Sequence, residues 1–143
     1  IMDVCTRIDD AISLAALVVS TLRALYRLRM KNQRWRDYSS MLIRENRWRA
    51  MRYSFDEGLI DFGKGSIVPF EELLDEFIEI SIEDAKKLGC DKEVMATKNI
   101  LKRGTSAHRQ LKTYELSIAK GKNKNEALND VVDMLINETA ADL

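Results

Sequence analysis

The feature that most constrains the fold is a long apolar segment near the start of the chain, residues 10–30. Two aspartates lead into it as an N-cap and first-turn acid, so the pattern predicts a helix. At about 100° per residue, apolar side chains cover most of its circumference and leave only Ser13, Ser20 and Arg27 as a polar strip. A chain of 143 residues can hardly cover such a helix alone. We therefore expect it to be buried against protein outside this chain, or against a second copy in a homo-oligomer.

The apolar segment and the cysteines also indicate a compartment. The uninterrupted apolar run at residues 11–22 is short for a bilayer-spanning helix and is bounded by charges. No basic segment precedes it, as one would in a signal peptide. Cys5 and Cys90 have neither metal-ligand spacing nor disulfide-rich surroundings, so free thiols in a reducing cytoplasm are expected. We predict a cytoplasmic chain without a membrane as a partner.

Glycine, proline and capping residues divide the rest of the chain into short elements. Gly63-Lys64-Gly65 separates two apolar stretches as a hairpin turn would, and Pro69 should end the second strand. Ser81 resembles a new helix start, whereas Gly89 and Gly104 resemble helix stops. The predicted fold class is mainly α with one small β-hairpin and a short N-terminal strand. Residues 1–143 then form a single segment with a strand at 1–8, a buried helix at 10–30, a basic aromatic helix at 34–53, the hairpin at 59–69, and helices over 70–143, among them 91–102, one beginning at Thr105 or Ser106, and 125–139.

Arginine and aromatic residues are concentrated in the helix expected at 34–53. The first 52 residues hold eleven Lys/Arg and five Asp/Glu, and the remainder holds twelve and eighteen. Either the first half binds anions, or the two halves attract each other. On the helix, Glu45, Arg49 and Arg52 share a face with aromatic side chains. A guanidinium on a buried face needs a carboxylate or phosphate partner, but a Glu45–Arg49 ion pair with the other charges solvated explains the pattern as well.

A basic helix with interleaved Trp and Tyr also raises the question of nucleic-acid binding, because arginine neutralises phosphate and aromatic rings stack on bases. The chain as a whole is neutral, contains no known nucleic-acid motif, and has an acidic second half that would repel a polyanion. We therefore predict no nucleic-acid partner.

Two further stretches carry polar groups that could form a site. On a strand over 1–8, Asp3, Cys5 and Arg7 would share one face, which could line a polar cleft or be the surface of an edge strand. Near residue 105 a helix stop is followed by a helix start, whose free N–H groups could hold an anion, although capping alone explains the residues there. His108 is the only histidine and has no partner at metal-ligand spacing, so no metal site is predicted.

Four stretches together resemble the C-terminal part of the bacterial type 2 glutamate–cysteine ligases and the related weak carboxylate–amine ligases. They occur in the order found in that family and extend over nearly the whole chain, so the set is specific although each stretch alone would be weak. The four stretches are Asp3-Val4-Cys5-Thr6-Arg7-Ile8-Asp9-Asp10-Ala11, Glu45-Asn46-Arg47-Trp48-Arg49-Ala50, Gly58-Leu59-Ile60-Asp61-Phe62-Gly63-Lys64 and Arg103-Gly104-Thr105-Ser106-Ala107-His108-Arg109-Gln110.

The resemblance implies that the chain is the C-terminal part of a glutamine-synthetase-like α+β fold. It also implies an ATP-dependent ligase of glutathione biosynthesis. The γ-carboxylate of glutamate is phosphorylated with the help of Mg²⁺, and cysteine or a related amine then displaces phosphate to give a γ-glutamyl amide. By that analogy Arg7 is the catalytic residue. The residues expected to bind substrate are Thr6, Asn46, Arg47, Arg49 and Arg52.

The resemblance further implies that the metal-binding glutamates, the nucleotide pocket and most of the sheet lie before residue 1. The expected partner is therefore the missing N-terminal half of the same protein. ATP and Mg²⁺ are expected as cofactors of the full-length enzyme, and no cofactor is expected for this chain alone, which should be inactive. The alternative is a non-catalytic helical module that binds a protein partner or itself through residues 10–30.

Overall fold

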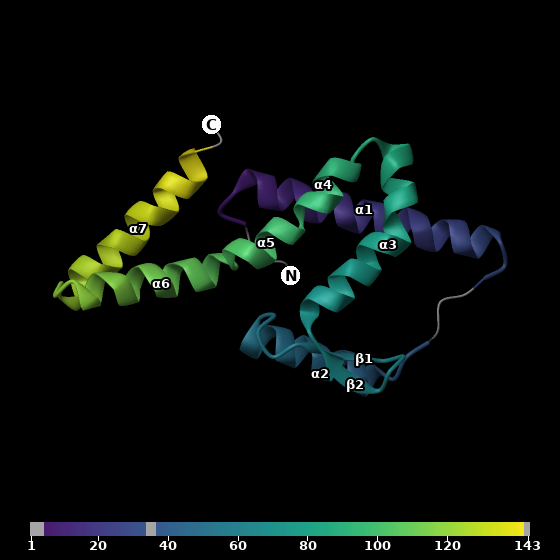
Figure 1. The fold of residues 1–143 in the computed structure, drawn as a ribbon, viewed down its shortest axis with the longest axis horizontal. Coiled ribbons are helices and arrows are strands. Elements are labelled where there is room, and N and C mark those ends of the chain that lie inside the picture. The colour runs from purple at the N-terminus through teal and green to yellow at the C-terminus, as the bar shows by residue number, and fades with distance from the viewer. Residues whose placement is uncertain (1–4, 34–36, 142–143) are drawn as a thin grey trace.

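The chain is mainly helical, with one small antiparallel hairpin. The structure, a computed structural model, describes residues 5–33 and 37–141 (Figure 1). Helices α1, α3 and α4 pack together, α2 lies beside the hairpin, and α6 and α7 form a helical pair that projects away from the rest. The elements are α1 (Ile8–Met30), α2 (Ser40–Tyr53), β1 (Leu59–Asp61), β2 (Ser66–Val68), α3 (Phe70–Leu88), α4 (Asp91–Ala96), α5 (Lys98–Arg103), α6 (Ser106–Ala119) and α7 (Lys124–Ala140).

The side of α1 that packs against α3 and α4 carries mainly small residues. Ser13, Ala16, Ser20 and Ala24 are buried there. Small side chains let the axes of neighbouring helices approach closely. Arg27 lies along the same side, so the polar strip predicted from the sequence faces the interior of this chain.

The opposite side of α1 is apolar and exposed. Val19, Leu22 and Tyr26 are 51%, 61% and 63% exposed, so within this chain the predicted burial of the helix is achieved on one side only. The prediction that its apolar length is too short for a bilayer was wrong, because α1 has 23 residues and is long and apolar enough to cross a membrane. A core helix of a soluble protein or a signal sequence has the same length and composition, so this property assigns no membrane location.

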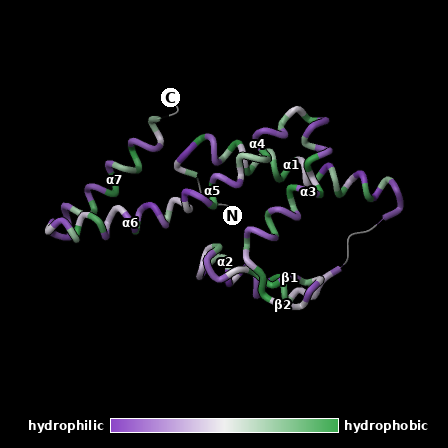
Figure 2. Tube along the Cα trace, viewed as in Figure 1, coloured by the Kyte–Doolittle hydropathy of each residue, from purple (hydrophilic) through white to green (hydrophobic). Residues whose placement is uncertain are grey.

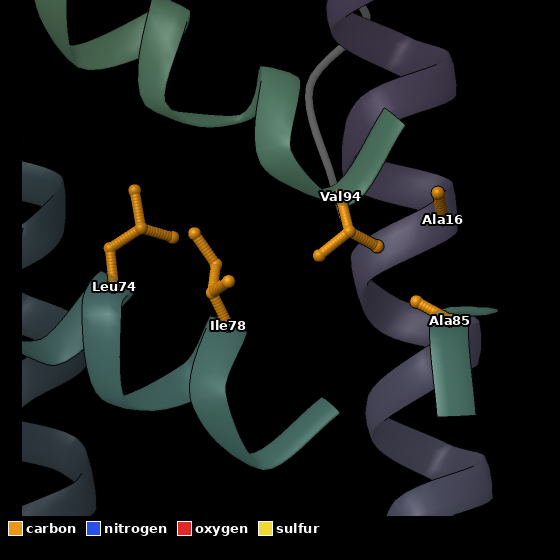
Figure 3. Packing of buried hydrophobic residues seen from close by; sticks show 5 residues of the cluster. All are labelled: Ala16, Leu74, Ile78, Ala85 and Val94. Atoms are coloured by element: carbon orange, nitrogen blue, oxygen red, sulfur yellow. The ribbon is translucent and has the colours of Figure 1, made fainter. Parts of the chain in front are cut away.

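The largest buried apolar cluster joins α1, α3 and α4. Its members are Ala16, Leu74, Ile78, Ala85 and Val94, which come from these three helices and converge in Figure 3. The cluster is small because the only buried apolar residue that α1 contributes to it is Ala16, with Leu17 partly buried beside it. The folded chain therefore buries little of the apolar surface that its sequence provides.

A buried carboxylate ties α3 to α1 beside this cluster. The side chain of Asp84 is only 2% exposed, and its two oxygens accept the Nε of Arg27 at 2.9 Å and face the Nε of Arg23 at 3.4 Å. A buried carboxylate requires such partners. Arginines of the basic first half thus pair with an acid of the second half.

The hairpin matches its prediction. Leu59 pairs with Val68 and Asp61 with Ser66 across the turn, and Pro69 follows as the N-cap of α3. In Figure 2 the hairpin is hydrophobic and the neighbouring α2 is largely hydrophilic. Of the two strands, β1 makes most of the contact with α2.

The predicted strand at 1–8 was wrong over the described residues 5–8, and residues 1–4 lie outside the described part. Thr6 and Arg7 form a bend and α1 already begins at Ile8. The helix predicted at 34–53 begins only at Ser40, because the side chain of Ser39 caps it by accepting the N–H of Met41 at 3.3 Å. Residues 34–36 of that prediction also lie outside the described part.

Two further helix boundaries differ from prediction for a shared reason. Ser81 does not begin a new helix, because its hydroxyl donates to the carbonyl of Phe77 at 2.7 Å inside the continuous α3. Thr97 interrupts the helix predicted at 91–102, and its hydroxyl donates to the carbonyl of Val94 at 2.6 Å. A serine or threonine hydroxyl can cap a new helix or donate to a carbonyl of the preceding turn. The sequence alone therefore does not decide whether a helix begins at such a residue.

Candidate ligand cleft

A cleft of about 1050 Å³ opens between the C-terminal end of α2 and the beginning of α6. The N-terminal bend, α2, the loop after α2 and the α5–α6 junction all contribute to it. Thr6, Arg47 and Arg52, three of the residues predicted to bind substrate, line this one cleft. The polar residues that face them across it include Asp56, Thr105, Ser106, His108 and Arg109.

Arg47 and Arg52 are the two arginines of the cleft whose guanidinium groups are left to bind a ligand. Both are exposed. Among residues 5–33 and 37–141, neither guanidinium has a hydrogen-bond or ion-pair partner. A guanidinium presents a planar set of donors that fits carboxylate or phosphate. This wall of the cleft can therefore accept an anionic group.

Asn46 and Arg49 instead hold the hairpin against α2. The side-chain amide of Asn46 donates to the carbonyl of Ile60 at 2.8 Å and its oxygen accepts the N–H of Ile60 at 2.7 Å. Arg49 donates to the carbonyls of Glu57 and Gly58 at 2.7 and 3.2 Å. Their side chains therefore satisfy backbone groups of the strand edge and its approach loop.

Asn46→Ala is expected to lower the free energy of unfolding by about 1–2 kcal/mol, because it leaves two backbone groups of Ile60 without their partner. Urea unfolding followed by circular dichroism measures the loss, and amide exchange at Ile60 should accelerate. Asn46→Asp is the matched control, because it keeps the acceptor for the Ile60 N–H but places an oxygen against the Ile60 carbonyl. Equal stability of Asn46→Ala and the unaltered chain would show that the contact contributes nothing.

Arg7 lies apart from that cleft. It lines a separate pocket of about 450 Å³ with Asp130, Asp133 and Glu138 of α7, and its Nη2 lies 3.8 Å from Asp9. Its Nε is buried without a hydrogen-bond partner among the described residues. The structure therefore does not bring Arg7 into one pocket with Asn46 and Arg49, because residues 6–7 form a bend instead of the strand that the prediction assumed.

Thr6 belongs to a polar latch that joins the N-terminal bend to α6 and α7. Arg109 of α6 donates to both oxygens of Glu138 of α7, from Nε at 2.5 Å and from Nη2 at 3.0 Å. The hydroxyl of Thr6 donates to Glu138 at 2.7 Å, and Arg109 also donates to the carbonyl of Gly104 at 2.6 Å. The hydrogen bonds from Arg109, then that from Thr6, lower the pKa of Glu138 despite the opposing effect of burial. We call Thr6, Arg109 and Glu138 the latch.

His108 fixes the beginning of α6, a role that sequence reasoning missed. Its Nδ1 accepts the backbone N–H of Thr105 at 3.1 Å and lies 2.7 Å from the Thr105 hydroxyl. Its Nε2 lies 3.0 Å from a carboxylate oxygen of Asp56, and its ring stacks on Phe55. The sequence left Thr105 and Ser106 as alternative caps, and the structure has Thr105 at that position. The three-residue spacing to His108 matches a capping box with an unusual third-position residue, so a search for it could have found this contact.

Within the described part of the chain, no group of three or more His, Cys, Asp or Glu side chains is arranged to hold a metal ion. The carboxylates of the latch and of the Arg7 pocket are engaged largely by arginine, lysine and hydroxyl donors. The cleft itself combines arginine and hydroxyl donors with the carboxylates of Asp10, Asp56 and Glu57.

Comparison with known proteins places this arrangement in a family. The profile of glutamate-cysteine ligase family 2 (GCS2) matches residues 1–134. The chain belongs to this family. Three similar proteins, each described as "Putative glutamate--cysteine ligase 2", come from Rhodospirillum rubrum at 54% identity, Jannaschia sp. at 46% and Paracoccus denitrificans at 43%.

Each of these family 2 relatives aligns with all 143 residues, yet the chain spans only 37% of the Rhodospirillum rubrum protein and 38% of the other two. No solved structure matches the chain. The described cleft and latch therefore belong to a family 2 segment that corresponds to little more than a third of the relatives' length.

Proposed function

We propose that this segment supplies the cationic wall of the substrate cleft in an ATP-dependent carboxylate–amine ligase that joins glutamate to cysteine or a related amine. Family membership supports the ligase class. The observation that carries the assignment to these residues is that Arg47 and Arg52 line the cleft with no partner in the described chain. Glutamate and ATP both carry the carboxylate or phosphate groups that such guanidiniums bind.

In the proposed reaction the γ-carboxylate of glutamate receives the terminal phosphoryl group of ATP, and the amine then displaces phosphate to form the amide. Arg47 and Arg52 hold an anionic group of a substrate and offset its charge. Thr6 lines the same cleft, but its hydroxyl is engaged by Glu138 and Arg109 of the latch. The resemblance assigns catalysis to Arg7, and its separate pocket means that this assignment depends on protein outside the described segment.

We expect the ligands of the Mg²⁺ ions in the proposed reaction to lie in the rest of the enzyme and not in this segment. Mg²⁺ prefers carboxylate and water oxygens in octahedral geometry, and the described residues offer no cluster of that kind. We therefore assign the Mg²⁺ ligands, and the remainder of a glutamine-synthetase-like sheet, to the part of the relatives' length that this chain does not span. On this proposal the full-length enzyme acts in the cytoplasm, and the segment alone does not catalyse ligation.

The activity test uses the full-length Rhodospirillum rubrum relative with its matching segment replaced by this chain, and measures cysteine-dependent ADP release with glutamate. Arg47→Ala and Arg52→Ala should each reduce kcat/KM about 10-fold or more, because each removes a charge-assisted contact to an anionic substrate. Arg44→Ala is the matched control, because Arg44 is an exposed arginine of the same helix that does not line the cleft. Unchanged kcat/KM in both cleft variants would overturn the assignment of the cationic wall.

A further inference from the structure

The exposed side of α1 is apolar over most of its length, and the exposed Arg29 enters it only in the last turn. At about 100° per residue, the apolar positions from Leu25 round to Ile12 span an arc of about 140°. We call this surface the outer face of α1. Its large apolar residues, all exposed, are Ile8, Ile12, Val18, Val19, Leu22, Leu25, Tyr26 and Met30.

The polarity of α1 is the reverse of that of a surface helix. An ordinary surface helix buries its large apolar residues and exposes its polar ones, whereas α1 buries serines and alanines and exposes valine, leucine and tyrosine. An exposed apolar surface of this kind marks an interface, and the described chain covers only the opposite side of α1.

We propose that the outer face of α1 docks against the rest of the same ligase polypeptide, which makes α1 the middle layer between that part and α3 with α4. The relatives contain more than half of their length outside the region that this chain matches, since the chain spans 37–38% of them. That remainder is joined covalently and is therefore present at a high effective concentration. This proposal rests on family membership and is independent of the reaction proposed for the cleft.

The inner side of α1 favours a protein layer over a bilayer as the occupant. Asp84 of α3 is bound by Arg23 and Arg27 of α1, and buried Asp10 of α1 is bound by Arg103 of α5. These ion pairs attach charged helices along the length of α1. Insertion across a bilayer would have to carry those charges into hydrocarbon or break the pairs, and both are costly.

The test measures thiol labelling at single positions in the full-length Rhodospirillum rubrum relative that carries this chain in place of its matching segment. Val19→Cys reports on the outer face, Ala24→Cys on the buried inner side and Lys120→Cys on an exposed turn. Peptide mass spectrometry follows each site, and labelling in denaturant normalises the rates. We expect Val19→Cys to be labelled at least ~10-fold more slowly than Lys120→Cys and to resemble Ala24→Cys.

Labelling of Val19→Cys at the rate of Lys120→Cys, with Ala24→Cys still protected, would overturn the proposal. Protection that grows with protein concentration would assign the outer face to a second copy. Protection that appears only with phosphatidylcholine–phosphatidylglycerol vesicles would assign it to lipid. Either result replaces the proposed occupant. None of these measurements requires ligase activity, so failure of the proposed reaction would leave the labelling result interpretable.

Discussion

Gly58→Ala is expected to lower the free energy of unfolding by about 3 kcal/mol. Gly58 has a positive φ of 65°, and a Cβ built there would lie 2.2 Å from the carbonyl oxygen of Val68. The carbonyl belongs to β2, so it can move only if the hairpin pairing shifts. The substitution therefore adds a backbone clash to the cost of a left-handed conformation. Urea unfolding followed by circular dichroism measures the change.

Gly65→Ala separates these two costs. Gly65 has nearly the same φ of 68°, but a Cβ there would meet no atom within 4 Å. Only the conformational term remains, and the expected loss is about 1 kcal/mol. A loss for Gly58→Ala no larger than that for Gly65→Ala would show that the hairpin accommodates the added carbon without cost.

The local boundaries of the fold are the part that the sequence predicts. Gly89 ends α3 in a left-handed conformation, Thr105 caps α6, and the hairpin turns at its glycines. Each of these depends on residues within a few positions of one another, where conformational preference and capping are strong. The predicted start of α2 was wrong because Ser39 caps the helix. An argument from side-chain periodicity alone places the start before that cap.

The orientation of α1 could not be predicted in the same way. Its pattern shows which sides are apolar, but not which side this chain covers. The answer depends on Ser13 and Ser20 being small enough for α3 and α4 to approach, and on Asp84 meeting Arg27 from 57 positions away. Arrangements of this kind follow from tertiary packing and leave no local pattern.

The same contrast between local pattern and tertiary packing applies to the candidate site. Arg47 and Arg52 line the cleft, whereas Asn46 and Arg49 on the same helix bind backbone groups of the hairpin. The latch was not predicted, because Thr6 and Glu138 are 132 positions apart. Helix periodicity indicates which side chains share a face. Their interaction partners are determined by the tertiary fold.

The latch is expected to be the principal attachment of α7 to the N-terminal bend, and Glu138→Gln should lower the free energy of unfolding by about 2–3 kcal/mol at pH 7. The Arg109 and Glu138 side chains are only 16% and 14% exposed, and breaking a buried pair typically costs about 3–5 kcal/mol, which partial exposure reduces. Glu115→Gln is the control, because it removes an equivalent charge from an exposed position of α6. Urea unfolding of the three proteins gives the comparison.

The pH dependence of the same pair gives a second, independent measurement. The folded pKa of Glu138 is lowered from its ordinary value of 4.5, chiefly by the hydrogen bonds from Arg109. As pH falls below 4.5, the unfolded chain therefore takes up the proton first, and the stability that the ionised carboxylate contributes is lost as pH passes through the folded pKa. The stability difference between the unaltered chain and Glu138→Gln should stay constant from pH 7 to about 5 and shrink in more acidic solution. A difference that stayed constant down to full protonation would mean that the carboxylate charge does not stabilise the latch.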